Sequence, residues 1–411
     1  MLNLIIYNSR IVGYYTLFEI FRIFSSIHII LYSISYLIKL FERTNNVFKN
    51  KFFNGERKMK IKLAVLDNDQ IYLQRLVSSL SMKYSDKFEI YSFTDEKIAV
   101  ETIAQSRIDV LIASDSFKID AKVLPSNCGF AYLVNSADIE MLDDQRVISK
   151  FQKIDMIYKQ ILSIYSENAG AISGLKIGDD STRVIFFSSP NGGTGTSSTA
   201  AACALSYAKQ GKKALYLNLE KFGSSDIFFE AEGQFDMSDI IYALKSRKTN
   251  LAMKIESCVK QDSSGVFFFS KSKVALDMFE LTDEDIMRLI NELKLTGSYD
   301  YIIVDVDFSM NQETMKLYKE GSVVVWVGDG SEYSNTKIQR AYEALKLKEQ
   351  NAEMPLFNRV CLIYNRFSSK TGKTVGDIGI RNVGGAQVFA NGTPKQIIEN
   401  LSNNDMFNKI I

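Results

Sequence analysis

Short apolar runs alternate with stretches of helical spacing along most of this chain. In residues 59–165 the apolar runs predict five strands, at 62–66, 88–92, 110–113, 130–134 and 146–149. Residues 70–84 and 96–105 place apolar side chains at helical intervals, so we predict helices there. Strands separated by helices are typical of βα units. We therefore expect a flavodoxin-like α/β domain in this part of the chain.

The same alternation resumes after residue 182 and continues to the C-terminus. The predicted strands are 184–187, 214–219, 265–269, 301–305, 322–327 and 359–364. The long helical stretches between them predict a doubly wound parallel sheet that is covered on both faces. Residues 166–182 contain three glycines and several polar side chains, so we expect an interdomain linker there. The second predicted domain thus spans residues 183–411.

Residues 1–58 are rich in Ile, Phe, Tyr and Asn and differ from the rest. Their longest uncharged run, 23–38, is shorter than the ~20 residues that a membrane-spanning helix needs. Three interpretations are open: a membrane anchor, an amphipathic interfacial helix, or a non-native extension ahead of a true start at Met59. We favour the start at Met59, because this residue lies directly before the first predicted strand.

Composition and charge exclude several classes of chemistry. The 411 residues carry a formal net charge of +1, which gives no electrostatic reason to expect nucleic acid. The four cysteines are far apart and form no CxxC pair, which argues against a zinc site, an iron–sulfur cluster or a disulfide framework. The single histidine, His28, lies in the N-terminal segment, so neither predicted domain has a histidine base.

A glycine-rich loop follows the strand at 184–187 and precedes an alanine-rich helical stretch. Residues 188–198 read SSPNGGTGTSS. A strand, a glycine loop and a helix N-terminus together cradle phosphate, because backbone N–H groups and the helix dipole favour the anion. The position before Ser197, where a P-loop carries its lysine, is Thr196. The loop is therefore predicted to hold a nucleotide and to be poorly equipped to hydrolyse it.

Three further strand ends carry polar side chains that suit a nucleotide site. Asp305 ends an apolar strand in a Walker B pattern, and we expect it to hold Mg²⁺ through water, with the Ser197 hydroxyl as a second donor. Glu220 offers another carboxylate after the strand at 214–219. Asn365 has both a donor and an acceptor for a base edge. Together with the loop, these features predict a P-loop nucleotide-binding domain.

The loop resembles the deviant Walker A motif of the MinD/ParA family. Gly192, Gly193, Gly195 and Ser197 match that motif. The resemblance implies that Asn191 replaces the lysine that reaches a dimer partner's nucleotide, and that Thr196 replaces the lysine on the β and γ phosphates. Both cations that drive turnover are then missing, and whether the protein is a weak ATPase stays open.

The same resemblance implies a set of site residues. Glu220 and Asp305 take the catalytic positions, Ser197 and Asp305 the metal positions, and ATP and Mg²⁺ are the expected cofactors. The expected nucleotide-binding residues are Asn191, Gly192, Gly193, Thr194, Gly195, Thr196, Ser197, Ser198, Asn365 and Arg366.

The first domain resembles a response-regulator receiver domain at its strand ends. Asp67 and Asp69 match the acidic residues that bind Mg²⁺ in that family, and Lys150 matches its lysine after the fifth strand. The phosphoacceptor position falls on Ser114, with Asp115 one place late. A slip of one residue moves a side chain to the other face of a strand. We therefore expect a receiver-like docking module rather than a domain phosphorylated at Asp115 or Asp67.

An atypical receiver domain followed by a lysine-deficient MinD/ParA-type domain resembles the TadZ/CpaE family. That family comprises cytoplasmic proteins of bacterial Flp/Tad pilus systems, which localise to the cell pole. The resemblance implies an ATP-binding assembly factor that forms a homodimer and binds pilus or secretion machinery at the membrane or pole. It implies a cytoplasmic protein, either free or peripheral to the inner membrane, whose nucleotide controls dimerisation or conformation with slow or absent hydrolysis.

Other classes remain as alternatives. The main one is a ParA/MinD-like partitioning or positioning ATPase with a receiver-type regulatory domain. An ATPase of this kind that acts on DNA would need a basic face. The densest group of lysines and arginines is spread over residues 245–260, which is more typical of a solvated face. A nitrogenase-reductase-like protein would need paired cysteines, and a P-loop tyrosine kinase would need a C-terminal tyrosine cluster. Residues 395–401 have an apolar face and are expected to form a packed terminal helix rather than a membrane anchor.

Overall fold

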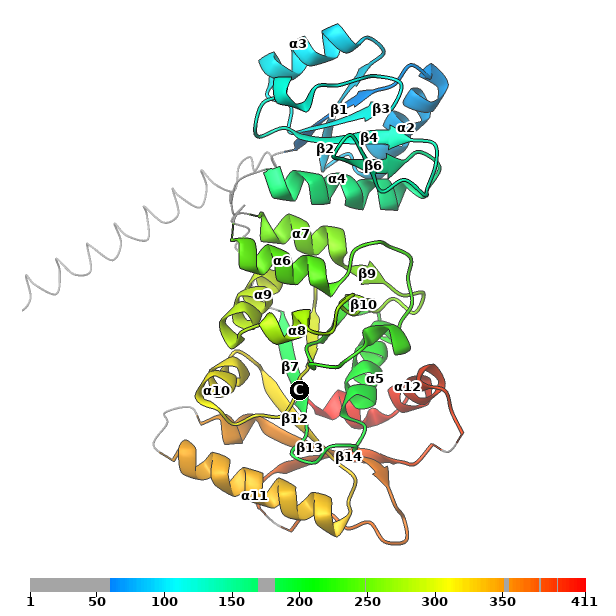
Figure 1. The fold of residues 1–411 in the computed structure, drawn as a ribbon. Helices are drawn as coiled ribbons and strands as arrows, with labels where there is room; N and C mark the ends of the chain where they lie inside the picture. Colours follow the sequence, from blue (N-terminus) through cyan, green and yellow to red (C-terminus); the bar gives the residue numbers. More distant parts are fainter. Residues whose placement is uncertain (1–59, 169–181, 248, 351–354, 377, 390) are drawn as a thin grey trace, which may run out of the picture. The chain divides into compact units, whose positions relative to one another are not determined.

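The computed structural model describes residues 60–168, 182–247, 249–350, 355–376, 378–389 and 391–411 (Figure 1). The N-terminal segment and residues 169–181 of the predicted linker lie outside this range, so the interpretations of residues 1–58 stay predictions. Across the described residues, no helix combines the length and the apolar character needed to cross a bilayer.

The first domain is built on a six-stranded sheet with the order β2-β1-β3-β4-β6-β5. Its strands are β1 (Ile61–Leu66), β2 (Phe88–Phe93), β3 (Val110–Ser114), β4 (Gly129–Val134), β5 (Met141–Leu142) and β6 (Gln145–Ser149). Its helices are α2 (Gln70–Lys83), α3 (Glu96–Ser106) and α4 (Ile154–Asn168). All strand pairs are parallel except the β5–β6 hairpin. This order confirms the flavodoxin-like fold.

Two connections in this domain depart from simple βα repetition. Only a 3₁₀ turn, η1 (Ala121–Val123), lies between β3 and β4, and the β5–β6 hairpin leads into the last parallel strand. Asp143 and Asp144 both have positive φ, at 50° and 59°, which is the conformation of a type I′ hairpin turn. Helix α4 also continues through residues 166–168, which the sequence had assigned to the linker.

The second domain contains an eight-stranded sheet with the order β14-β13-β12-β7-β11-β8-β10-β9. The strands are β7 (Arg183–Ser188), β8 (Ala214–Asn218), β9 (Lys260–Gln261), β10 (Phe267–Phe268), β11 (Tyr301–Asp305), β12 (Val323–Gly328), β13 (Val360–Phe367) and β14 (Arg381–Gln387). Only β9 runs antiparallel to its neighbour, β10. Because β7 lies at the centre, the loop that follows it opens at the carboxyl edge of the sheet.

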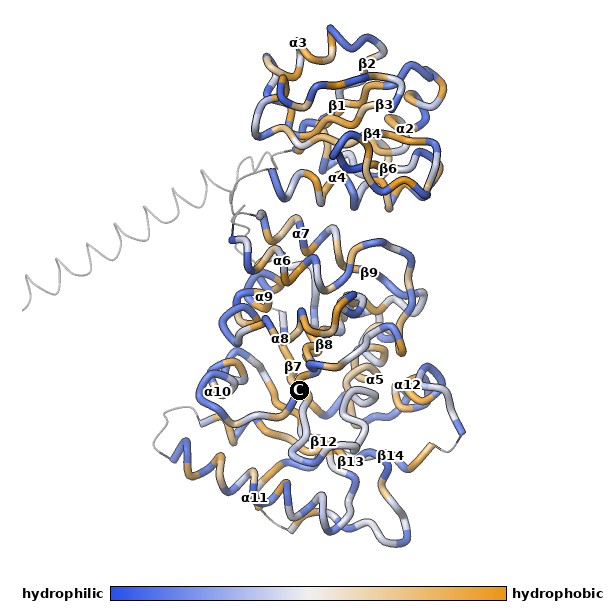
Figure 2. The backbone as a smooth tube through the Cα atoms, viewed as in Figure 1, coloured by the Kyte–Doolittle hydropathy of each residue, from blue (hydrophilic) through white to orange (hydrophobic). Residues whose placement is uncertain are grey.

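Helices cover both faces of this sheet, as predicted. They are α5 (Thr196–Lys209), α6 (Met237–Ser246), α7 (Leu251–Cys258), α8 (Asp277–Glu280), α9 (Asp283–Leu295), α10 (Gln312–Lys319), α11 (Glu332–Lys348) and α12 (Pro394–Ser402), with short 3₁₀ turns η2 (Ser225–Ile227), η3 (Leu356–Arg359) and η4 (Asp405–Lys409). Along β7, Val184 and Phe186 join one core while Ile185 and Phe187 join the other. A helix that covers a sheet has one apolar side and one polar side, and Figure 2 shows hydrophilic and hydrophobic residues alternating along α11.

The C-terminal helix α12 packs against α5, which confirms the expectation of a packed element. Ile398, Leu401 and Phe407 are buried in the core on that face. At the rim, the Lys209 ammonium lies 2.6 Å from the Glu399 carboxylate, and the Tyr207 hydroxyl donates to the carbonyl of Phe407 at 3.1 Å. The apolar face at 395–401 is therefore used inside this domain.

Helices α4 and α7 pack together within the compact unit that spans residues 61–411. The Lys254 side chain of α7 is 2% exposed. Its ammonium donates to Ser163 Oγ at 2.9 Å and forms ion pairs with Glu167 and Asp239 at 3.3 and 3.2 Å. A buried lysine needs such partners, because an unpaired charge is costly to desolvate. Lys254 thus links α4 to α6 and α7.

Candidate functional site

The glycine loop has the backbone that a phosphate cradle requires. It connects the end of β7 to the N-terminus of α5, and Gly195 is the N-cap of that helix. Gly193 and Gly195 have φ of 83° and 82°, a region that residues with a Cβ rarely adopt. At Gly195 a Cβ would also lie 2.4 Å from the Asn365 amide nitrogen. Backbone conformation and close approach therefore both require glycine at residue 195.

The two positions that carry lysine in the motif lie in different places. Asn191 is buried in the loop, where its backbone N–H donates to the Ser189 hydroxyl at 3.1 Å. Thr196 lines the cavity at the first turn of α5, with its hydroxyl 3.2 Å from that of Thr194. A neutral hydroxyl therefore stands at the position of the phosphate-binding lysine.

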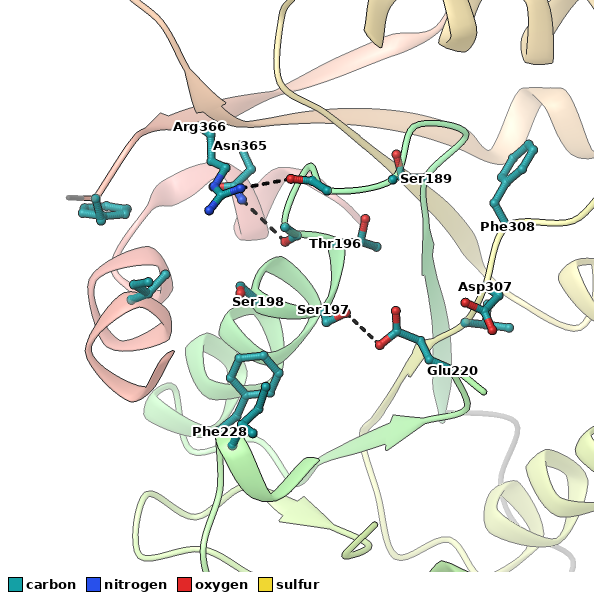
Figure 3. A pocket seen from close by; sticks show the side chains of 17 residues that line it. Ser189, Thr196, Ser197, Ser198, Glu220, Phe228, Asp307, Phe308, Asn365 and Arg366 are labelled. Atoms are coloured by element: carbon teal, nitrogen blue, oxygen red, sulfur yellow. Dashed lines mark hydrogen bonds between the residues drawn. The ribbon is translucent and has the colours of Figure 1, made fainter. Parts of the chain in front are cut away.

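A cavity of about 410 Å³ opens in front of the loop (Figure 3). This volume lies in the range of small-molecule sites, which is about 300–1,000 Å³. Of the predicted site residues, the cavity wall includes Gly192, Gly193, Gly195, Thr196, Ser197, Ser198, Glu220, Asn365 and Arg366. Thr194 and Asp305 are fully buried behind that wall. The structure thus brings most of the predicted nucleotide-binding residues to one cavity.

Asp305 lies at the end of β11 in a polar network below the cavity. One carboxylate oxygen, Oδ2, accepts from the Tyr216 hydroxyl at 2.8 Å and from the Asn218 amide at 3.1 Å. The other, Oδ1, is buried without a hydrogen-bond partner. Burial, and after it the nearby Glu220 carboxylate, raise the pKa of Asp305 well above its usual range. The site therefore places a carboxyl group where an added positive charge would be strongly favourable.

The residues around Asp305 fit a magnesium ion. The hydroxyl of Ser197, a predicted metal donor, donates at 2.9 Å to Oε2 of Glu220, the carboxylate that follows β8 and was predicted as catalytic (Figure 3). Oδ1 of Asp305 has no hydrogen-bond partner, so this oxygen would be available to hold a hydrated cation. When bound, Mg²⁺ would neutralise phosphate charge at this end of the cavity.

No group of three or more His, Cys, Asp or Glu side chains suited to a metal ion occurs among the described residues. Magnesium at nucleotide sites commonly uses one or two carboxylates and completes its octahedron with water and substrate phosphates.

The end of the cavity at Glu220 is rich in carboxylates and poor in cations. Glu220 and Asp307 both line it, and Asp305 lies beneath. Lys221, which follows Glu220 in the sequence, donates its ammonium to the carbonyl of Met278 in α8 at 2.7 Å. Arg366 is the one cationic side chain among the described residues that line the cavity. The structure therefore offers no described lysine in place of the two missing ones.

Asn365 and Arg366 approach the loop from the end of β13, on the side away from Glu220 (Figure 3). The Asn365 amide donates to the carbonyl of Thr194 at 2.9 Å, and an Arg366 N–H donates to the carbonyl of Gly193 at 3.0 Å. Both side chains thus contact the loop itself. Their expected contact with a base stays a prediction.

The acidic site of the first domain is occupied by its own lysine. Asp67 is fully buried, and the Lys150 ammonium lies 2.7 Å from its carboxylate. The same ammonium donates to Ser114 Oγ at 3.3 Å, whereas Asp115 is exposed at the surface. Ser114 therefore holds the inward position at the end of β3, as the slip in the sequence predicted.

Several cavity residues were not predicted from the sequence. These are Ser189, Ile227, Phe228, Val306, Phe308, Phe389 and Ile397. Tyr216, which supports Asp305 from below, was also missed. Alternation along β8 could have identified Tyr216. Residues two apart lie on the same side of a strand, and Tyr216 is two residues before Asn218. Phe389 follows β14, a strand with no apolar pattern to reveal it.

A family comparison assigns the first domain. Residues 59–166 match the family described as "TadZ-like, receiver domain". The match covers the first domain, and the second domain that follows it is a doubly wound parallel sheet with a glycine loop after β7. A search of curated proteins found no match to the chain.

Solved structures of ParA and MinD proteins are similar to this chain. A ParA family ATPase from Chlorobium tepidum TLS is 18% identical with a TM-score of 0.45, over 56% of this chain and 97% of that one. The MinC:MinD cell division protein complex of Aquifex aeolicus gives 17% and 0.43, over 56% and 95%. MinD from Pyrococcus horikoshii OT3, complexed with Mg-ADP, gives 15% and 0.42, over 54% and 94%.

Proposed function

We propose that this protein is an ATP-binding localisation and assembly factor of a bacterial Flp/Tad-type pilus system. Nucleotide and Mg²⁺ control its dimerisation or conformation, and hydrolysis is slow or absent. The supporting observation is the division within the cavity. The glycine cradle, Ser197 and the carboxylates are retained, while a neutral hydroxyl, that of Thr196, lines the cavity at one lysine position and the neutral Asn191, at the other, is buried in the loop.

Different interactions bind a nucleotide and accelerate its hydrolysis. Backbone N–H groups and a helix N-terminus bind phosphate oxygens without any lysine. A cation aimed at the transferring phosphoryl group is worth about 10³-fold or more in rate. A site that keeps the cradle and lacks the cations is therefore suited to binding without rapid turnover.

The assignment to a pilus system rests on the TadZ-like receiver domain, and partners at the membrane or pole belong to the same proposal. A ParA/MinD-like positioning ATPase with a receiver-type regulatory domain is the second candidate. The two candidates differ in turnover, since the second requires sustained hydrolysis.

The state of association tests the proposal. We expect the full chain to form a homodimer with ATP and Mg²⁺, and to be monomeric without them, as measured by size-exclusion chromatography with light scattering. Gly195→Ala should abolish the response, because its Cβ meets Asn365 and its φ is 82°. Gly376→Ala is the matched control, since a Cβ there meets nothing within 4 Å. A mass that is the same with and without nucleotide would contradict control by ATP.

A further inference from the structure

Two polar side chains of β8 contact the carboxylates at the Glu220 end of the cavity. Tyr216 and Asn218 are two residues apart, so they lie on the same side of the strand. The Tyr216 side chain is fully buried, and its hydroxyl donates to Oδ2 of Asp305 at 2.8 Å. The Asn218 amide nitrogen lies 3.1 Å from the same Oδ2 and 3.0 Å from the Tyr216 hydroxyl. One oxygen of Asp305 therefore accepts two hydrogen bonds.

The same amide also reaches the second carboxylate. Its nitrogen lies 3.3 Å from Oε2 of Glu220, which accepts in addition from the Ser197 hydroxyl at 2.9 Å. An amide NH₂ has two donors, enough for one hydrogen bond to each carboxylate. The Asn218 amide oxygen accepts from the backbone N–H of Glu220 at 3.2 Å, and a Cβ at Gly223 would collide with that oxygen. The orientation of the Asn218 amide is thus fixed by the chain around it.

These hydrogen bonds leave each of the two carboxylates with one oxygen for a cation. A carboxylate oxygen has two lone pairs, and donors take both of them on Asp305 Oδ2 and on Glu220 Oε2. Oδ1 of Asp305 is buried and has no hydrogen-bond partner among the described residues. While the hydrogen bonds hold, a cation at this end can therefore contact either carboxylate through one oxygen only.

Mg²⁺ and Ca²⁺ differ in how they use carboxylates. Ca²⁺ takes about 6–8 oxygen ligands in a flexible geometry, often with both oxygens of one carboxylate. Mg²⁺ is smaller, keeps several waters and uses one or two carboxylates in a near-ideal octahedron. Contacts through single oxygens suit Mg²⁺ and deprive Ca²⁺ of ligands that it would otherwise use.

We propose that Tyr216 and Asn218 are positioning residues that make this site select Mg²⁺ over Ca²⁺. They act through Asp305 and Glu220, because they hold each carboxylate with a single oxygen available to the ion. This inference rests on the proposed nucleotide site and adds its metal specificity. Hydrogen bonds that only satisfied buried groups would stabilise the fold and leave the choice of metal unchanged, so the two roles give different results.

Titration calorimetry of the full chain with ATP, once with Mg²⁺ and once with Ca²⁺, tests the inference. We expect the parent protein to bind ATP at least about tenfold more tightly with Mg²⁺. Tyr216→Phe removes only the hydroxyl and frees a lone pair of Asp305 Oδ2. It should weaken binding with Mg²⁺ by about tenfold or more, as expected when a metal-binding carboxylate loses a partner, and change binding with Ca²⁺ by less than about threefold. Tyr207→Phe is the matched control, because this buried tyrosine donates to the carbonyl of Phe407 instead.

Asn218→Ala is the second variant, at a half-buried side chain, and decides the question if Tyr216→Phe does not fold. It removes the amide from both carboxylates, and we expect the same loss of selectivity. Circular dichroism melting checks that each variant is folded. Equal affinity of the parent for ATP with either metal would overturn the inference, as would folded variants that weaken binding with both metals alike. If the parent binds ATP with neither metal, the proposed function itself is wrong and the inference falls with it.

Discussion

Single side chains decide what this cavity does with a phosphate. Thr196 lines it with a neutral hydroxyl, while Glu220 and Asp307 line its other end with negative charge. On the proposed function, we expect such a site to repel a free triphosphate and to accept one whose charge is offset by a divalent cation. Nucleotide binding is therefore expected to depend on Mg²⁺ more than it would in a P-loop with its lysines.

Thr196→Lys should restore the missing point charge. A hydrogen bond to a charged group contributes about 1.5–3 kcal/mol, so we expect ATP to bind roughly 10- to 100-fold more tightly. The same change should raise the ATP hydrolysis rate, measured by phosphate release. Asn191→Lys is the comparison, because residue 191 is buried in the loop and outside the cavity wall, and we expect no gain in affinity within one subunit. Equal affinity for parent and Thr196→Lys would contradict this account of the cavity.

At the scale of elements, the end of β3 controls the chemistry of the first domain. Ser114 faces Lys150 and the buried Asp67, while Asp115 is exposed. Incubation with acetyl phosphate and Mg²⁺ should therefore leave the intact mass of the protein unchanged. A phosphoryl adduct that disappears in Asp115→Asn would contradict the prediction and revive a phosphorylated receiver.

The C-terminal helix and turn are the second element with a clear test. Phe407 is fully buried beneath α5, so Phe407→Ala should reduce the free energy of unfolding by about 3–5 kcal/mol. Leu347→Ala, at a side chain that is 74% exposed on α11, should change it by less than about 0.5 kcal/mol. Urea unfolding measures both. Similar small effects would mean that the C-terminus contributes little to this core.

Most elements could be predicted from the sequence, because strong apolar runs mark the buried parallel strands. Strand β14 was missed, since RNVGGAQ has one large apolar residue and two glycines. The type I′ turn at Asp143 and Asp144 was missed because it lacks the usual glycine. Most of the site residues could be predicted together, but the groups to which they hydrogen-bond in the fold could not. Lys221 bonding to α8 and Asn365 bonding to the loop depend on tertiary packing.

At the scale of the whole molecule, Lys254 links helices of the two domains. Lys254→Met removes its charge and leaves Glu167 and Asp239 without this partner. We expect a loss of about 1.5–3 kcal/mol and a second transition in urea unfolding as the domains uncouple. Lys212→Met, at an exposed lysine, is the control. A single, unshifted transition for Lys254→Met would show that this junction does not couple the domains.

If the proposed function is right, the protein binds ATP with Mg²⁺ and turns it over slowly or not at all. The most direct measurement pairs calorimetric titration of the full chain with a phosphate-release assay on the same sample. We expect saturable binding that is lost when EDTA removes the metal, with a turnover well below the typical enzyme value of about 10 s⁻¹. No binding to the parent protein, or turnover as fast as that of an ordinary ATPase, would contradict the account.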